Sequence, residues 1–222
     1  MDSILVSLLP FIIGSALVPI QNIINILLLR SPRQGLLKAT AYVGGMTILR
    51  LLQGLIFGLI FANEEGGGKS LIVLTLQLVL GVLLLITAYK QWRNEDDPDA
   101  PPPKWLTMID NLTPSKAFGF GFVILLISGK AWVFTLSAIG VIGATQLGQP
   151  SSTIAYLLFV LLAESLLLVS ILFRVITPEK SKALLEQASA WLTRYNRQIV
   201  MLVSLVFGLL FLYQGASGLL NL

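Results

Sequence analysis

Six long apolar runs dominate the chain, at approximately residues 4–29, 36–61, 71–92, 118–145, 153–176 and 199–219. Each reaches the roughly 20 residues that a helix needs to cross about 30 Å of hydrocarbon. Backbone groups in lipid must be hydrogen-bonded within the segment, and these runs lack the alternation of barrel strands. Charged residues make up 12% of the chain, whereas soluble domains carry about 25%. The sequence therefore predicts an all-α integral membrane protein with six transmembrane helices.

The composition also restricts the chemistry. The chain has no Cys and no His, which removes thiol chemistry, the commonest general base and the usual ligands of transition metals. Glu164 is the single carboxylate inside the six runs, so an intramembrane centre of paired carboxylates is also missing. We expect no enzymatic activity, no catalytic residue, no metal site and no cofactor.

The basic residues predict the orientation in the membrane. Of the 15 Lys and Arg residues, 12 lie in or beside the loops after the first, third and fifth runs, and the opposite side carries Lys69. The positive-inside rule places those three loops in the cytoplasm and both termini outside. Topology thus accounts for the net charge of +4, and we expect no binding of nucleic acid.

The segment 94–112 predicts a division into two halves. It is acidic and Pro-rich ("NEDDPDAPPPKW" from Asn94), which is typical of a disordered cytoplasmic linker. It separates a first three-helix repeat, residues 1–93, from a second, residues 113–222. "LVLGVLLL" (78–85) aligns with "LVFGLLFL" (205–212). Since each half has an odd number of helices, the two would enter the membrane from opposite sides, as in the inverted repeats of many transporters.

A further, amphipathic helix is predicted at about residues 178–195. Thr177 suits the N-cap and Pro178 the first helical position. Four residues of this segment share one helical face: Leu184, Ala188, Trp191 and Tyr195. We expect the helix to lie in the inner membrane interface, anchored by Trp191.

Two interruptions occur in matching helices of the two halves, so that helices 1 and 4 are expected to be broken. Pro19 interrupts the first run and is followed by Gln21, Asn22 and Asn25; the fourth run is interrupted by Ser128, Gly129 and Lys130. A Pro kink alone is usually structural. Two breaks at similar depth, one beside a charge, favour a substrate site built from these seven residues.

The segments that contain these breaks resemble a known family. They are "LVPIQNIINILLLRSPRQGLLKATAYVGG" (17–45) and "LTPSKAFGFGFVILLISGKAWVFTLSAIG" (112–140). They are similar to the lysine-exporter (LysE) superfamily and, within it, to the GAP branch of sulfolipid-addressing-like proteins; Gly129 stands where that superfamily often has Pro. The resemblance implies a multi-pass protein of the bacterial inner membrane that exports small or lipid-linked molecules.

Three ionisable residues fall near helix centres: Arg50, Lys130 and Glu164. A charge there costs about 2.5 to 3.5 kcal/mol on insertion scales. We expect Arg50 and Glu164 to pair, either only to neutralise each other or so that Glu164 carries a coupling proton. Lys130 lies too deep for easy snorkelling and would attract an anionic substrate group.

The function expected from these features is secondary export by alternating access. The substrate would be small or lipid-linked, and anionic or zwitterionic. A non-transporting accessory or scaffold protein for lipid or glycolipid export is the alternative. The expected partners are the substrate and membrane lipids, and the sequence leaves a homodimer open.

Overall fold

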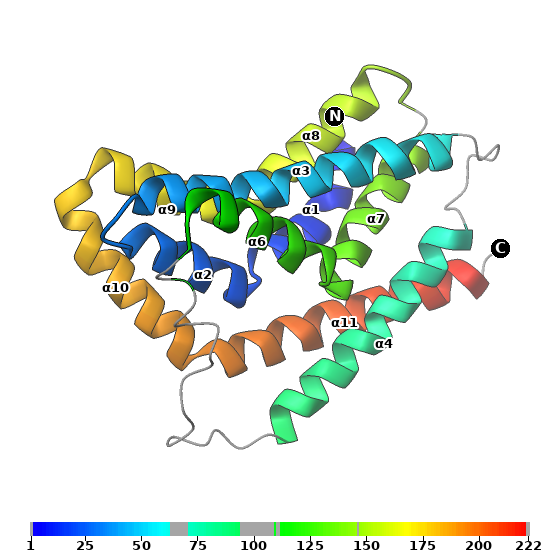
Figure 1. Cartoon of the computed structure of the whole chain (residues 1–222). Coiled ribbons are helices and arrows are strands. Elements are labelled where there is room, and N and C mark those ends of the chain that lie inside the picture. Colours follow the sequence, from blue (N-terminus) through cyan, green and yellow to red (C-terminus); the bar gives the residue numbers. More distant parts are fainter. Residues whose placement is uncertain (1, 63–70, 94–108, 110–111, 146, 221–222) are drawn as a thin grey trace.

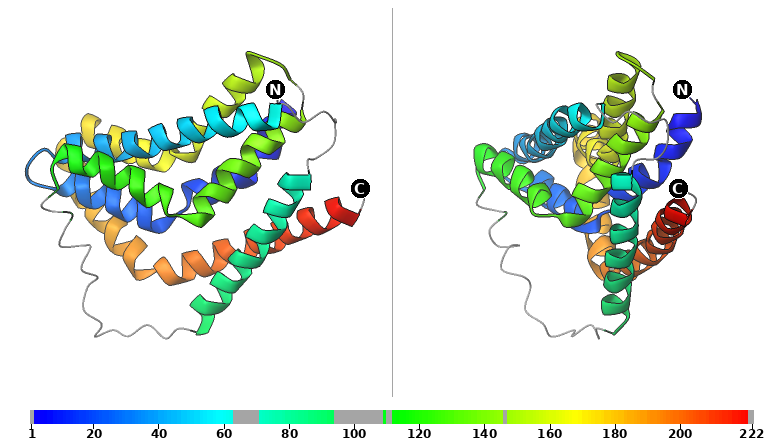
Figure 2. Two further views of the ribbon diagram at one scale, coloured as in Figure 1. Left: turned by 45° about the vertical axis from the view of Figure 1, so that its right-hand side comes forward. Right: turned by 90° about the vertical axis from the view of Figure 1, so that its right-hand side faces the viewer.

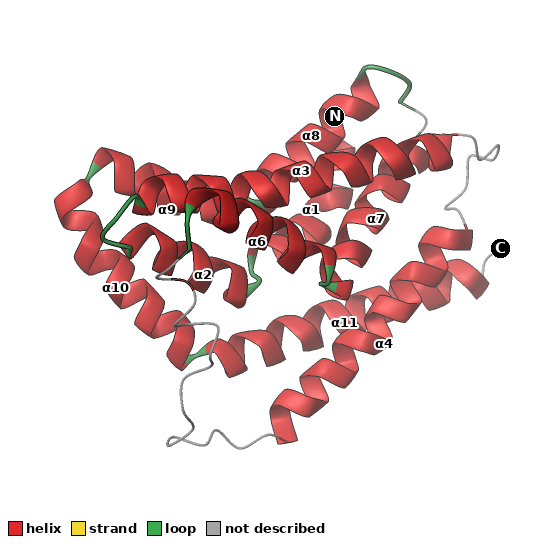
Figure 3. Ribbon diagram, in the orientation of Figure 1, coloured by secondary structure: helices red, strands yellow, loops and turns green. Residues whose placement is uncertain are grey.

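The computed structural model describes residues 2–62, 71–93, 109, 112–145 and 147–220, and these are almost entirely helical (Figures 1 and 3). The all-α prediction is confirmed. The described helices are α1 (Asp2–Ala16), α2 (Pro19–Arg30), α3 (Gly35–Ala62), α4 (Leu71–Arg93), α6 (Pro114–Leu126), α7 (Gly129–Ala144), α8 (Ser151–Ala163), α9 (Ser165–Ile176), α10 (Pro178–Arg194) and α11 (Asn196–Leu220).

Two breaks fall where the sequence predicts them. α1 and α2 meet at 57°, with Pro19 as the first residue of α2 after an extended Val18. Pro is favoured there because its missing N–H would be unsatisfied in the first turn anyway. α6 and α7 meet at 74°, and the Ser128 hydroxyl caps α7 by accepting from the Ala131 N–H at 3.4 Å.

A third break was not predicted. The fifth apolar run divides into α8 and α9, which meet at 62° around Glu164. No Pro or Gly marks this point in the sequence. Within the described residues, the single helices α3 and α11 and the three bent pairs are long and apolar enough to cross a membrane. The chain is therefore a multi-pass membrane protein.

Two buried apolar clusters lie along the bundle. One joins α1, α4, α7, α8 and α11, and its centre is a group of stacked and edge-on aromatic rings: Phe11, Phe134, Phe207 and Phe211. The other joins α2, α3, α6, α7, α9 and α10 and includes Tyr42 and Met46. Large apolar side chains are also exposed on most helices, as expected for a surface that faces lipid.

Glycines allow two pairs of helices to pack closely. A Cβ on Gly121 of α6 would meet the backbone carbonyl of Tyr42 in α3. A Cβ on Gly81 of α4 would lie 2.6 Å from the backbone nitrogen of Leu212 in α11. Small residues let helix backbones approach in membranes, where van der Waals packing drives association.

The predicted amphipathic helix is present as α10, at Pro178–Arg194. Thr177 occupies the N-cap, but its hydroxyl donates back to the Phe173 carbonyl instead of capping α10. Leu185 is buried against the bundle, whereas Leu184 and Trp191 are exposed. Arg30 at the end of α2 pairs with Glu186 at 3.0 Å.

Most of the predicted linker lies outside the described residues, so its disorder stays a prediction. Ile109 is an exception: it is buried in the second apolar cluster. Its carbonyl also accepts from the Leu112 N–H at 3.2 Å.

Candidate functional site

A buried ion pair lies at the unpredicted bend. Arg50 of α3 and Glu164 between α8 and α9 are 3.3 Å apart, from Nε to Oε1, and their side chains are 1% and 3% exposed. These two atoms are close enough for an ionic contact but are not aligned as a hydrogen bond. The structure thus brings together two residues that the sequence expects to pair.

Hydroxyl groups hold both ends of the pair. The Thr47 hydroxyl, one turn before Arg50, lies 2.6 Å from Glu164 Oε2 and 2.9 Å from the Val43 carbonyl, and its one proton is available to both acceptors. Arg50 Nη1 donates to Thr135 Oγ1 of α7 at 3.0 Å, and the guanidinium lies 5.9 Å from the centre of the Phe159 ring. Tyr156 donates its hydroxyl proton to the Arg50 carbonyl. Three membrane segments therefore converge on one charged centre.

Sequence reasoning missed Thr47, Thr135 and Tyr156. Thr47 and Arg50 are three residues apart and so share a helix face, which is a signal that the sequence does contain. No such spacing relates Thr135 of α7 to Arg50, because the contact depends on how two helices pack.

The polar residues after Pro19 are all buried, but they serve different partners. Asn22 donates from Nδ2 to the carbonyls of Ala16 and Val18, both at 3.0 Å, and so satisfies the end of α1. Asn25 donates to the Leu167 carbonyl in α9 at 3.1 Å. Gln21 is 4% exposed. Asn25 thus links the first break to the first turn after the bend at Glu164.

Lys130 lies in the first turn of α7 and is half-buried, while Gly129 beside it is exposed. Among the described residues, α7 packs against α1, α3, α4, α6 and α8, and α2 packs against α3, α9, α10 and α11. The structure therefore does not join Lys130 to the amides of α2 by direct helix packing. Of these polar residues, Asn25 contacts α9, three residues after Glu164.

Further polar atoms are buried without a hydrogen-bond partner among the described residues. They are Asn25 Oδ1, Tyr42 Oη, both amide atoms of Gln53, Gln77 Oε1, Ser15 Oγ and Ser137 Oγ. Buried polar atoms of this kind in native proteins bind ordered water or a ligand. Tyr42 and Gln53 lie on α3 with Arg50, so this helix gives the interior a polar stripe.

Three bent helix pairs and an ion pair inside the apolar core define a multi-pass helical membrane protein with a charged interior. The chain belongs to the family described as Sap, sulfolipid-1-addressing protein (SfLAP), whose sequence model matches residues 8–217. The resemblance to sulfolipid-addressing-like proteins expected from the two motif segments is thereby confirmed. Neither the curated proteins nor the solved structures contain a significant match.

Proposed function

We propose that the protein is a secondary exporter of an anionic or zwitterionic molecule, small or lipid-linked, and that it is not an enzyme. The observation that carries the proposal is the Arg50–Glu164 pair at a helix bend in the membrane interior. Intramembrane charges are costly and mark substrate or ion pathways by default. Membership of the sulfolipid-1-addressing family supports a role in lipid export.

The geometry of the pair suits a coupling role. Glu164 is held by the Thr47 hydroxyl and by an ionic contact with Arg50 Nε. It also lies at the bend between α8 and α9. We assign the coupling proton to Glu164, and substrate contacts to Lys130 and the residues around both predicted breaks. The purely structural alternative is that Arg50 and Glu164 only neutralise each other.

An inverted repeat of three plus three helices is supported by the crossing of α4 and α11. The sequence alignment pairs Gly81 with Gly208 and Leu85 with Leu212. A Cβ on Gly81 would meet Leu212, and a Cβ on Gly208 would meet Leu85 at 2.9 Å. Replacing Gly81 by its equivalent Gly208, and Leu212 by its equivalent Leu85, converts the first contact into the second. Two contacts related in this way are what a two-fold axis between the repeats produces. We propose residues 1–93 and 113–222 as the repeats.

The arrangement of chain ends supports both termini on one side of the membrane, and we propose α4 as a sixth crossing beside the five candidate spans. In Figures 1 and 2 the N-terminus, the end of α3, the link between α7 and α8 and the C-terminus gather at one end of the molecule. The α2–α3 and α9–α10 links lie at the other end. We propose that this second end, which contains Arg30 and Arg33, faces the cytoplasm of a bacterial inner membrane.

Single-cysteine labelling tests this topology, and the natural chain offers no competing thiol. In intact cells, a membrane-impermeant maleimide should label Gln149→Cys and should leave Arg33→Cys unlabelled until the membrane is permeabilised. Both positions are exposed. The opposite pattern would invert the proposed orientation.

Export itself is tested by comparing lipids and metabolites outside a deletion strain complemented with different variants. Lys130→Ala should reduce the exported compound about tenfold, because one charge-assisted contact is lost. Lys116→Ala, at an exposed position at the start of α6, is the control. Equal export by wild type and Lys130→Ala would remove Lys130 from the site. A scaffold protein would show no flux of the compound in proteoliposomes.

A further inference from the structure

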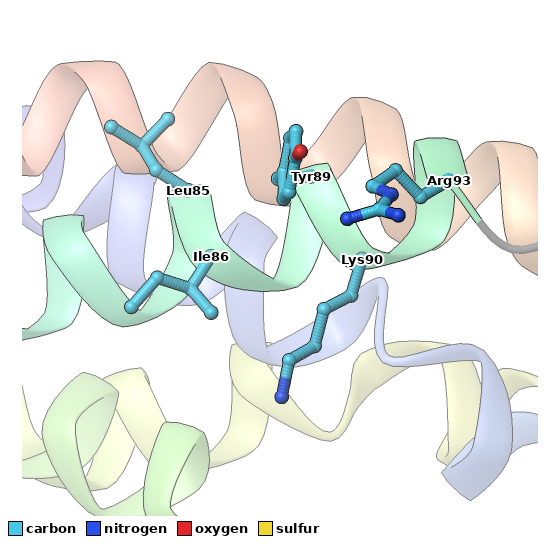
Figure 4. A pocket seen from close by; sticks show the side chains of 5 residues that line it. All are labelled: Leu85, Ile86, Tyr89, Lys90 and Arg93. Carbon is cyan, nitrogen blue, oxygen red and sulfur yellow. The ribbon is translucent and has the colours of Figure 1, made fainter.

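A surface hollow with a cavity volume of about 570 Å³ lies along the last two turns of α4 (Figure 4). We call it the α4 hollow; its lining residues are Leu85, Ile86, Tyr89, Lys90 and Arg93. All five of these described lining residues belong to one helix. The α4 hollow lies apart from the ion pair at Glu164.

The lining changes from apolar to cationic along the helix. Along α4 the order is Leu85 and Ile86, then Tyr89, then Lys90 and Arg93; Figure 4 shows the Arg93 guanidinium turned toward Tyr89 and the Lys90 side chain extending away from it on the side of Ile86. Eight residues of helix separate Leu85 from Arg93, which is about 12 Å. A membrane lipid changes from apolar to polar over a similar length, because its acyl chains lie deep in the membrane and its headgroup lies at the interface.

The two cations are not needed to cap their own helix. Basic residues in a last turn often bond the free carbonyls of the helix end. In this protein Arg197 of α11 binds those carbonyls, since its Nε donates to the Gln91 carbonyl at 2.7 Å and its Nη2 to the Trp92 carbonyl at 3.2 Å. The positive charge of Lys90 and Arg93 therefore faces outward from a helix end that Arg197 already satisfies.

Aromatic side chains fix this end of α4 at the membrane interface. The Arg93 guanidinium lies 5.8 Å from the centre of the Tyr89 ring. Tyr89 and Trp92 are 53% and 68% exposed, and their rings lie 6.1 Å apart. Tyr and Trp with Lys or Arg at a helix end mark the headgroup level. A headgroup at this level would lie beside the helix end that carries Lys90 and Arg93.

We propose that the α4 hollow binds one phospholipid with an anionic headgroup. Lys90 and Arg93 hold the phosphate, and Leu85 and Ile86 contact the start of the acyl chains. The choice of an anionic lipid follows from charge complementarity, since both charged residues among the described part of the lining are cationic. The site holds a lipid whether or not the protein exports one.

Native mass spectrometry of the delipidated full-length protein tests the proposal. The probes are dioleoylphosphatidylglycerol, dioleoylphosphatidylcholine and soluble glycerol phosphate. The wild type should retain one phosphatidylglycerol, and Lys90→Gln combined with Arg93→Gln should weaken this binding about 30-fold, from the loss of two interfacial cations. Exchanging the two residues, Lys90→Arg with Arg93→Lys, should preserve it.

The matched control is Arg33→Gln with Lys116→Gln, which removes the same charge from exposed positions elsewhere. Equal loss in the control and in the Lys90/Arg93 variant would show general surface attraction and overturn the site. Equal retention of phosphatidylcholine would overturn the anionic preference. Glycerol phosphate that binds as tightly as the lipid would show a soluble anion site instead. Each variant is required to elute in size-exclusion chromatography as a single peak at the volume of the wild type.

Discussion

Glu164→Leu should lower the free energy of unfolding by about 3 to 5 kcal/mol, because it leaves the Arg50 guanidinium uncompensated in the apolar interior. Arg50 is 1% exposed, and Thr135 would remain as its side-chain hydrogen-bond partner. In detergent, the midpoint of thermal unfolding should fall by about 10 °C. Arg50→Met should have a similar effect, since it leaves the Glu164 carboxylate buried.

The double variant Arg50→Met with Glu164→Leu decides whether the two residues are partners. Replacing a buried ion pair by apolar residues of similar size is often neutral, so the double variant should recover most of the lost stability. A double loss equal to the sum of the single losses would contradict the pairing. A stable double variant without export would assign the pair to transport.

Gly121→Val should destabilise the protein by about 3 kcal/mol, near the upper end of typical overpacking effects. A Cβ at Gly121 meets the Tyr42 carbonyl of α3, so the two helix backbones must separate. The measurement is again the thermal midpoint in detergent, with an expected decrease of about 10 °C.

Gly119→Val is the matched control, two residues away on the same helix. A Cβ there has no neighbouring atom within 4 Å, and the change in helix propensity is the same in both variants. Its thermal midpoint should stay within about 2 °C of the wild type. Equal losses at both positions would show that propensity, and not close packing, determines the effect.

The sequence predicts the breaks that have a local chemical cause. Pro19 lacks an N–H and Ser128 can cap a helix, so α2 and α7 begin at or beside the expected residues. The bend at Glu164 has no such cause. The Glu164 N–H still bonds the Val160 carbonyl, and its own carbonyl still accepts from Leu168. At the bend, Glu164 contacts Arg50 and Thr47 of α3, which are distant in the sequence, and no local pattern records such contacts.

In the candidate site, too, the sequence predicts some features and misses those that depend on how helices pack. The free-energy cost of burying a charge in lipid predicts that Arg50 and Glu164 pair, because each needs a partner there. This cost does not determine how one helix is rotated relative to another. Hence the sequence groups Asn25 with Lys130, whereas the structure bonds Asn25 to Leu167, next to the bend. Whether these residues meet a substrate stays a prediction.

The crossing of α4 and α11 has a consequence for the origin of the chain. On the proposed repeat, its two contacts are equivalent to each other, Gly81 to Leu212 and Gly208 to Leu85. A protein of half this length, inserted in the membrane in both orientations, would form the same contact between two separate copies. Gene duplication and fusion could then join the copies without designing a new interface, and the acidic segment after Arg93 would be the trace of that joining.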